Sequence, residues 1–106
     1  MAFDHKLVAV LNKDVEVGVV MNALAHMTIG LGSSIGQDLL RLDTYVDANS
    51  NGYPYISQIP FIILRAKSNE IRKTVMIARE HTIQHTVFLN TMTVGTYVEQ
   101  VRTPFF

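Results

Sequence analysis

The chain has 106 residues, no cysteine, 48% apolar residues and nine basic side chains against nine acidic ones. This length predicts a single domain, residues 1–106, and the apolar content favours a folded globule over a disordered chain. Without cysteine, disulfides and thiolate metal sites are excluded, a composition that suits a reducing cytoplasm. The zero net charge argues against a general nucleic-acid-binding protein, which usually carries a basic excess.

The first predicted unit is a strand, a turn and a long helix. Lys6–Leu11 is an apolar run with poor alternation, which predicts a strand buried on both faces. Asp14–Gly18 follows as the turn, and a helix begins near Gly18. Its apolar positions cover nearly the whole circumference, so we expect it to be buried. Gly30 and Gly32 weaken its end, and a second short helix is expected over Ile35–Leu42.

The apolar stretch Val17–Leu31 also has to be weighed as a membrane span. As a helix it would be about 22 Å long, whereas the hydrocarbon core of a bilayer is about 30 Å thick. It also contains the polar side chains Asn22, His26 and Thr28. We therefore interpret it as a core helix and expect no membrane span.

The middle of the chain predicts a surface excursion followed by a second strand. Leu42–Ser57 carries the strong turn signal Asn51-Gly52, which indicates an irregular hairpin or Ω-like loop. Pro54 and Pro60 keep this segment away from the centre of a sheet. Phe61–Leu64 is then a second apolar run, typical of a buried strand.

A second helix and a third strand complete the pattern. Ser68 is a candidate N-cap for a helix that we expect to end near His81. Thr86–Leu89 predicts a third buried strand. The tail Thr91–Arg102 fits helical and strand spacing equally well, and both alternatives stay open. The alternation of strands and helices predicts an α/β domain.

Several of these residues form motifs that are shared with a known group of proteins. The motifs are Asp14, Gly18, Asn22–His26 and Gly30–Gly32, together with Asn90–Gln100 in the tail. With them the chain resembles an uncharacterised bacterial domain family that shares its fold with the type II peptidyl-tRNA hydrolases. The resemblance implies a three-layer α/β/α domain on a small mixed sheet. It also implies one more strand beyond Phe106, so this member is either shortened or completed by a partner.

The related hydrolases supply a mechanism against which to compare the residues. The resemblance expects a lysine where this chain has Val19, a glutamine where it has Ala23, and an acidic residue where it has Thr91. Ester hydrolysis needs a group that activates water and donors for the developing oxyanion. These three side chains supply little of that, so the activity does not follow from the fold.

One polar corner nevertheless remains a candidate site. Asn22 and His26 are four residues apart on one helical face, and Asp14 follows the first strand, where α/β sheets often bind ligands. The candidate catalytic residues are His26, Asp14 and Thr91; the candidate ligand-binding residues are Asn22, Thr93, Tyr97 and Gln100. The alternative is a structural histidine, buried and paired with Asn22 or a backbone carbonyl.

Two further patterns favour ordinary explanations. His81 and His85 have the spacing of a zinc motif but no glutamate between them, so we predict no metal site. The basic side chains between Arg65 and Arg79 are offset by Glu70, which indicates a solvated helix face.

The sequence thus leaves two function classes open. The first hypothesis is a cytoplasmic domain that binds a small molecule or a protein partner, needs no cofactor or metal, and forms a homodimer through Tyr97–Phe106. Nucleic acid and membrane are not expected partners. The competing hypothesis is a hydrolase that acts on an ester or amide at the corner formed by Asp14, His26 and Thr91.

Overall fold

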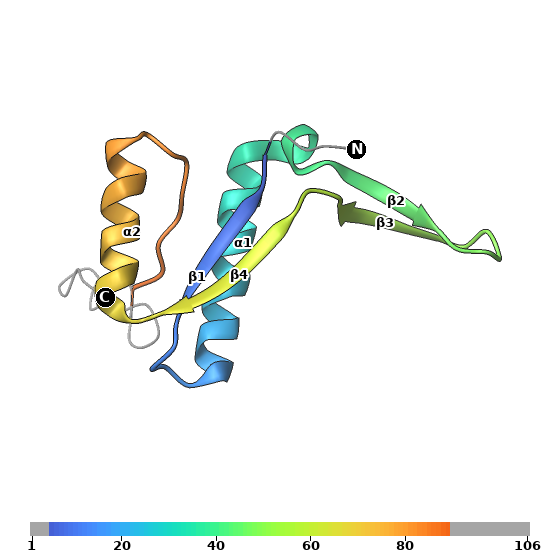
Figure 1. Ribbon diagram of the computed structural model, residues 1–106. Helices are drawn as coiled ribbons and strands as arrows, with labels where there is room; N and C mark the ends of the chain where they lie inside the picture. Colours follow the sequence, from blue (N-terminus) through green and yellow to red (C-terminus); the bar gives the residue numbers. More distant parts are fainter. Residues whose placement is uncertain (1–4, 90–106) are drawn as a thin grey trace, which may run out of the picture.

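The computed structural model describes residues 5–89, which form a small mixed α/β domain with two helices and two small sheets (Figure 1). The elements in chain order are β1 (Leu7–Asn12), α1 (Val17–Leu40), β2 (Leu42–Val46), β3 (Gly52–Ser57), β4 (Phe61–Ala66) and α2 (Ser68–Glu80). The α/β class and the position of each of these elements were predicted from the sequence. The site depends mainly on β1 and on the two helices beside it.

The first sheet pairs the two apolar runs in parallel. Leu7 lies opposite Phe61, and the register continues to Asn12 opposite Ala66. Both strands were predicted, but the expected burial was wrong for each of them. Of β1 only Leu11 is buried, and Val8 is 49% exposed. The side chains at positions 61–64 are 40–54% exposed. Within residues 5–89 the two helices pack mainly against β1, so the faces of β4 are left largely uncovered.

Helix α1 begins at Val17, where the Glu16 carboxylate accepts a hydrogen bond of 3.0 Å from the Gly18 N–H. The helix continues to Leu40 but breaks at Gly36, which adopts a φ of 86°. The predicted division into two helices is therefore present, although it lies beyond Gly30 and Gly32, where it was expected. Positive φ favours glycine, because other residues pay a steric cost there.

The expected all-round burial of α1 is not observed. Only Val20 and Ala23 of this helix are buried, and with Leu11 and Ile59 they are the buried apolar residues within 5–89. By length and composition alone α1 could cross a membrane, with a mean hydropathy of 1.2 in its most apolar stretch. The core helix of a soluble protein passes the same test, so this property does not place α1 in a membrane.

Helix α2 ends as predicted, with His81 at its C-terminal cap. Its beginning differs from the prediction, because Lys67 occupies the N-cap and Ser68 is already helical. The Ser68 hydroxyl instead accepts a hydrogen bond of 2.9 Å from the Asn12 side-chain amide. This serine therefore ties α2 to the end of β1.

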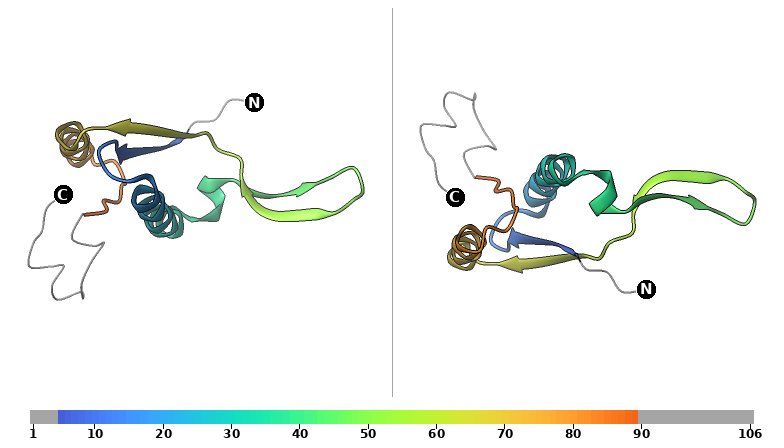
Figure 2. Two further views of the ribbon diagram at one scale, coloured as in Figure 1. Left: turned by 90° about the horizontal axis from the view of Figure 1, so that it is seen from below. Right: turned by 90° about the horizontal axis from the view of Figure 1, so that it is seen from above.

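The prediction of a third strand at Thr86–Leu89 is wrong, because this segment has no strand geometry. Residues 83–89 return alongside α2, on the side of β1 that faces away from β4 (Figures 1 and 2). Side chains hold them to α1: Gln84 donates to Ser34, and Thr86 donates to the Met27 carbonyl at 3.4 Å. Within the described chain, no ladder of backbone hydrogen bonds joins residues 83–89 to β1. A strand requires such a ladder.

The second sheet is the predicted hairpin, formed by antiparallel β2 and β3, which projects away from the helices (Figure 2). Pro54 lies in β3, outside the β1–β4 sheet, as expected. The Asp47 carboxylate organises the tip by accepting hydrogen bonds of 2.9 Å from the backbone N–H groups of Asn49 and Asn51 and from the Tyr53 hydroxyl. The tip of the hairpin is thus completed by contacts within six residues of sequence.

Candidate functional site

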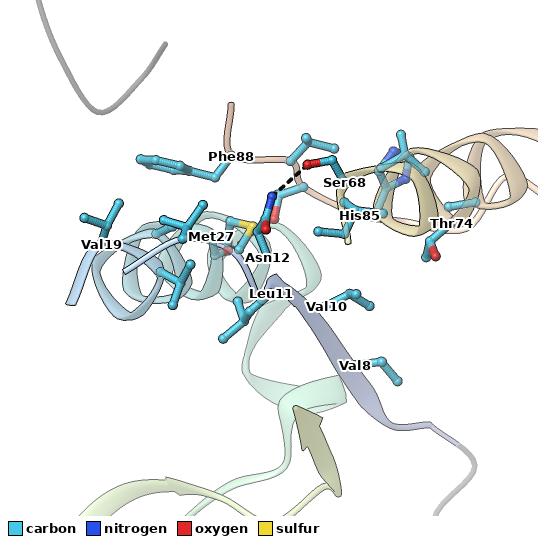
Figure 3. A pocket seen from close by; sticks show the side chains of 18 residues that line it. Val8, Val10, Leu11, Asn12, Val19, Met27, Ser68, Thr74, His85 and Phe88 are labelled. Carbon is cyan, nitrogen blue, oxygen red and sulfur yellow. Dashed lines mark hydrogen bonds between the residues drawn. The ribbon is translucent and has the colours of Figure 1, made fainter. Parts of the chain in front are cut away.

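A cavity of about 310 Å³ lies beside β1, between α1, α2 and residues 85–88 (Figure 3). Strand β1 contributes Val8, Val10, Leu11 and Asn12 to its wall. Because β4 occupies the opposite edge of β1, the cavity lies where a further strand of the sheet would be placed. Its size falls at the lower end of the range for small-molecule sites.

The walls of this cavity are mainly aliphatic. Helix α1 supplies Val19, Val20, Ala23 and Met27, and α2 supplies Ile71, Val75 and Ala78. None of the lining residues is an aspartate, glutamate, lysine or arginine. An apolar ligand would gain from burial here, whereas an ion would lose hydration without finding a charged partner.

The polar side chains at the cavity are engaged with the protein itself. Asn12 donates to Ser68 and accepts a hydrogen bond of 2.9 Å from the Asp14 N–H. Thr74 donates to the Glu70 carbonyl at 2.9 Å, as threonines in helices often do. His85 places its Nδ1 2.7 Å from the carbonyl of Ile83. These bonds leave hydrocarbon as the main surface that the cavity offers.

The polar corner predicted from the sequence lies beside this cavity. His26, Asn22 and Asp14 are all exposed, and none of them lines the cavity. The imidazole of His26 stacks on Phe88, with ring centroids 5.9 Å apart, and Phe88 is part of the cavity wall. The alternative of a buried, structural histidine is therefore wrong for this residue.

The structure does not bring the predicted catalytic set together within the residues it describes. No hydrogen bond joins the side chains of Asp14, Asn22 and His26 in residues 5–89. The remaining candidates lie outside the described residues: Thr91, Thr93, Tyr97 and Gln100. Sequence reasoning missed the apolar wall itself, although Val19 and Ala23 had already marked two places where polar groups were expected.

The part of the chain that the structure describes contains no cluster of metal ligands. No group of three or more histidine, aspartate or glutamate side chains is close enough to hold an ion there. His85 contacts the cavity, whereas His81 caps α2. The two histidines therefore have separate structural settings.

Comparison with known proteins identifies a family without assigning a chemistry. A family model described as a protein of unknown function (DUF2000) matches residues 5–105. No curated protein matches the chain. A solved structure of a protein of unknown function from Agrobacterium tumefaciens is similar, with a TM-score of 0.79 and 21% identity. The match covers 95% of this chain and 74% of that one, and at this identity it concerns the fold alone.

Proposed function

The chain belongs to the DUF2000 family, proteins of unknown function, and we propose that it is a binding domain that holds an apolar ligand. The ligand site is the cavity between β1, α1, α2 and residues 85–88. The observation that carries the proposal is the aliphatic wall contributed by all of these elements, without a charged side chain. Apolar surface that is buried in such a cavity gains about 25 cal/mol per Å².

Two wall residues support binding over hydrolysis. Val19 and Ala23 stand where the resemblance to type II peptidyl-tRNA hydrolases expects lysine and glutamine, and both line the cavity. Side chains that would stabilise a developing negative charge are thus replaced by hydrocarbon. The position that serves chemistry in those hydrolases is here suited to contact with an apolar group.

We also propose the finer, three-layer arrangement of those hydrolases for this chain. It is supported by the parallel pairing of β1 with β4 and by helices that flank β1 (Figure 2). The segment 83–89 would then be the outer part of the same layer as β1. A crystal structure with α1 and α2 on the same face of the sheet would contradict this layering.

The proposal is tested by filling the cavity. Decanol is titrated against the full chain with bound N-phenyl-1-naphthylamine, and displacement of the fluorescent probe gives its affinity. Ala78→Leu places three additional carbons in the cavity, because Ala78 is part of its wall. We expect the affinity to fall about tenfold or more, since each buried methylene contributes about 0.8 kcal/mol.

A matched control makes the same substitution elsewhere. Ala25 is an exposed residue of α1 that does not line the cavity, so Ala25→Leu is expected to bind decanol as the native chain does. Thermal unfolding of both variants establishes that they are folded. Equal affinity of the two variants, or no saturable binding by the native chain, would contradict the proposed site.

A further inference from the structure

Residues 84–88, which we call the strap, form one wall of the cavity and lie along α1. Every second side chain of the strap contacts this helix: Gln84 donates to the Ser34 hydroxyl, Thr86 donates to the Met27 carbonyl at 3.4 Å, and Phe88 stacks on His26. Four residue steps of extended chain span about 13 Å, and the eight steps between His26 and Ser34 span about 12 Å of helix. The strap is therefore extended and antiparallel to α1.

The strap begins at a fixed turn at the end of α2. The Ile83 N–H donates to the Ala78 carbonyl at 2.8 Å, and the Thr82 N–H donates to the Arg79 carbonyl at 3.3 Å. These two bonds form a Schellman motif, in which Thr82 has the expected positive φ of 53°. Ile83 is thus fixed to α2 by its backbone, whereas the contacts that join the strap to α1 are made by side chains. This change places a hinge at Ile83.

The contacts between the strap and α1 are ones that break at small cost. Gln84 and Thr86 are exposed, so water can replace their hydrogen bonds. The Thr86 bond is also longer than the length of about 2.8 Å that is usual for a hydroxyl donor. Phe88 is half-buried, and it both stacks on His26 and lines the cavity, on the side of Met27 (Figure 3). Through this stack α1 positions an apolar part of the cavity wall.

We infer that the strap closes the cavity over its ligand and opens by turning about Ile83, with His26 as the positioning residue that keeps it closed through Phe88. The inference rests on the proposed binding function and adds how the ligand enters and leaves. The other walls are a strand and two helices, whose backbones are hydrogen-bonded in regular ladders. Segments without such regular pairing open at lower free energy, so the strap is the wall that moves.

The expected signature of this role lies in rates and not in affinity. His26 does not line the cavity, so it contacts Phe88 whether or not a ligand is bound. Loss of the stack raises the open fraction of the strap in both states. Because entry and release both pass through the open state, the two rates rise by the same factor and the equilibrium affinity stays the same.

The test measures both rates on the full chain by stopped-flow fluorescence. Mixing the empty chain with increasing N-phenyl-1-naphthylamine gives the entry rate, and mixing the loaded chain with excess decanol gives the release rate. His26→Ala is expected to raise both rates about threefold or more, because an aromatic stack is lost, and to keep the affinity within about twofold.

Two variants control for the substitution itself. His26→Phe keeps a ring against Phe88 and is expected to retain the native rates. Ile29→Ala removes a side chain of the same helix that is 71% exposed and does not line the cavity. It is also expected to retain the native rates.

A covalent bridge tests the movement of the strap directly. The chain has no cysteine, so Ser34→Cys combined with Gln84→Cys supplies a single pair of thiols, which a short bismaleimide joins. We expect entry and release to slow about tenfold or more in the bridged chain, because the strap can no longer leave α1. The matched control is the same double variant with each thiol capped by N-ethylmaleimide, which is expected to exchange ligand at least as fast as the native chain.

Three outcomes would overturn the inference. The first is equal rates in the bridged and the capped chain, because the ligand would then not pass the strap. The second is His26→Ala with native rates. The third is His26→Ala with faster release and native entry, which would make His26 a support of the wall and not of its closure. In each case saturable binding by the native chain leaves the proposed binding function standing, whereas loss of that binding would contradict both.

Discussion

Within residues 5–89, the β2–β3 hairpin and the cavity-facing edge of β1 differ in what is left uncovered: apolar side chains in the hairpin, and backbone groups in β1. At the tip of the hairpin the polar groups are paired, with the Asp47 carboxylate accepting from Asn49, Asn51 and Tyr53, while side chains such as Tyr45 and Ile56 are 65% and 55% exposed. At β1 the side chain of Leu11 is buried, but the backbone of Val10 is unpaired in the described chain.

The difference follows from the sequence distance between partners. The tip of the hairpin is completed by residues within six positions of Asp47, and its strands pair residues no more than 15 positions apart, as in Leu42 opposite Ser57. Strand β1 pairs with β4, in which Phe61, the partner of Leu7, lies 54 residues later in the sequence. Polar groups whose partners are near in sequence are paired as soon as the local structure forms. Groups whose partners are distant in sequence depend on the packing of several elements, and a cavity can remain between those elements.

The largest expected effect tests whether stability resides around β1 and not in the hairpin. Leu11 is 8% exposed beneath the helices, and Leu11→Ala is expected to lower the free energy of unfolding by about 2–5 kcal/mol. Ile56→Ala in β3 is expected to change it by no more than about 0.5 kcal/mol, because the side chain is exposed. Urea denaturation of both variants measures the difference.

The outcome that would break this part of the comparison is a similar loss in both variants. It would mean that the hairpin side chains are buried in the protein as it exists in solution. Equal losses at low and high protein concentration would place that burial within one chain, and a concentration-dependent loss would place it between copies.

The smallest expected effect concerns the pH dependence of the hairpin tip. The hydrogen bond from the backbone of Asn51, together with the Tyr53 hydroxyl, lowers the pKa of Asp47 below its ordinary value of 3.8. The folded hairpin therefore favours the ionised carboxylate. The stability that this group contributes is present above pH 3.8 and is lost as the pH falls through the lowered pKa.

NMR titration of the Asn51 and Tyr53 amides in acid is the measurement. We expect one titration step below pH 3.8 in the native chain, and no such step in Asp47→Asn. The amides of β1 should not follow that step, because within residues 5–89 the hydrogen bonds of the Asp47 carboxylate are all with residues of the tip. A step at or above pH 3.8 would contradict the pairing described for this carboxylate.

Local signals in the sequence were sufficient for most of the elements. The apolar runs at β1 and β4, the Asn51-Gly52 turn and the end of α2 near His81 were all predicted, because each depends on residues close in sequence. The break in α1 was expected at Gly30 and Gly32 but lies at Gly36. Gly30 and Gly36 have the same intrinsic preference, and only the packed structure selects Gly36 for a φ of 86°.

The errors share a dependence on distant partners. Thr86–Leu89 is apolar enough for a strand, but a strand also needs a hydrogen-bonded neighbour, and its side chains contact α1 instead. The site was sought among polar residues such as His26, whereas the cavity is lined by residue types that look like ordinary core. Residues such as Val75 and Ala78 carry no sequence signal that distinguishes a cavity wall from a filled core.

The most direct measurement is to locate a bound apolar molecule on the native chain. NMR contacts between decanol protons and protein methyl groups are recorded at saturating decanol. The account predicts contacts to the methyl groups of Val10, Val75 and Ala78, which line the cavity, and none to Ile56 of the exposed hairpin. Contacts to Ile56 without contacts to Val10 and Ala78 would show that decanol follows exposed apolar surface, and would contradict the assignment of the cavity as the binding site.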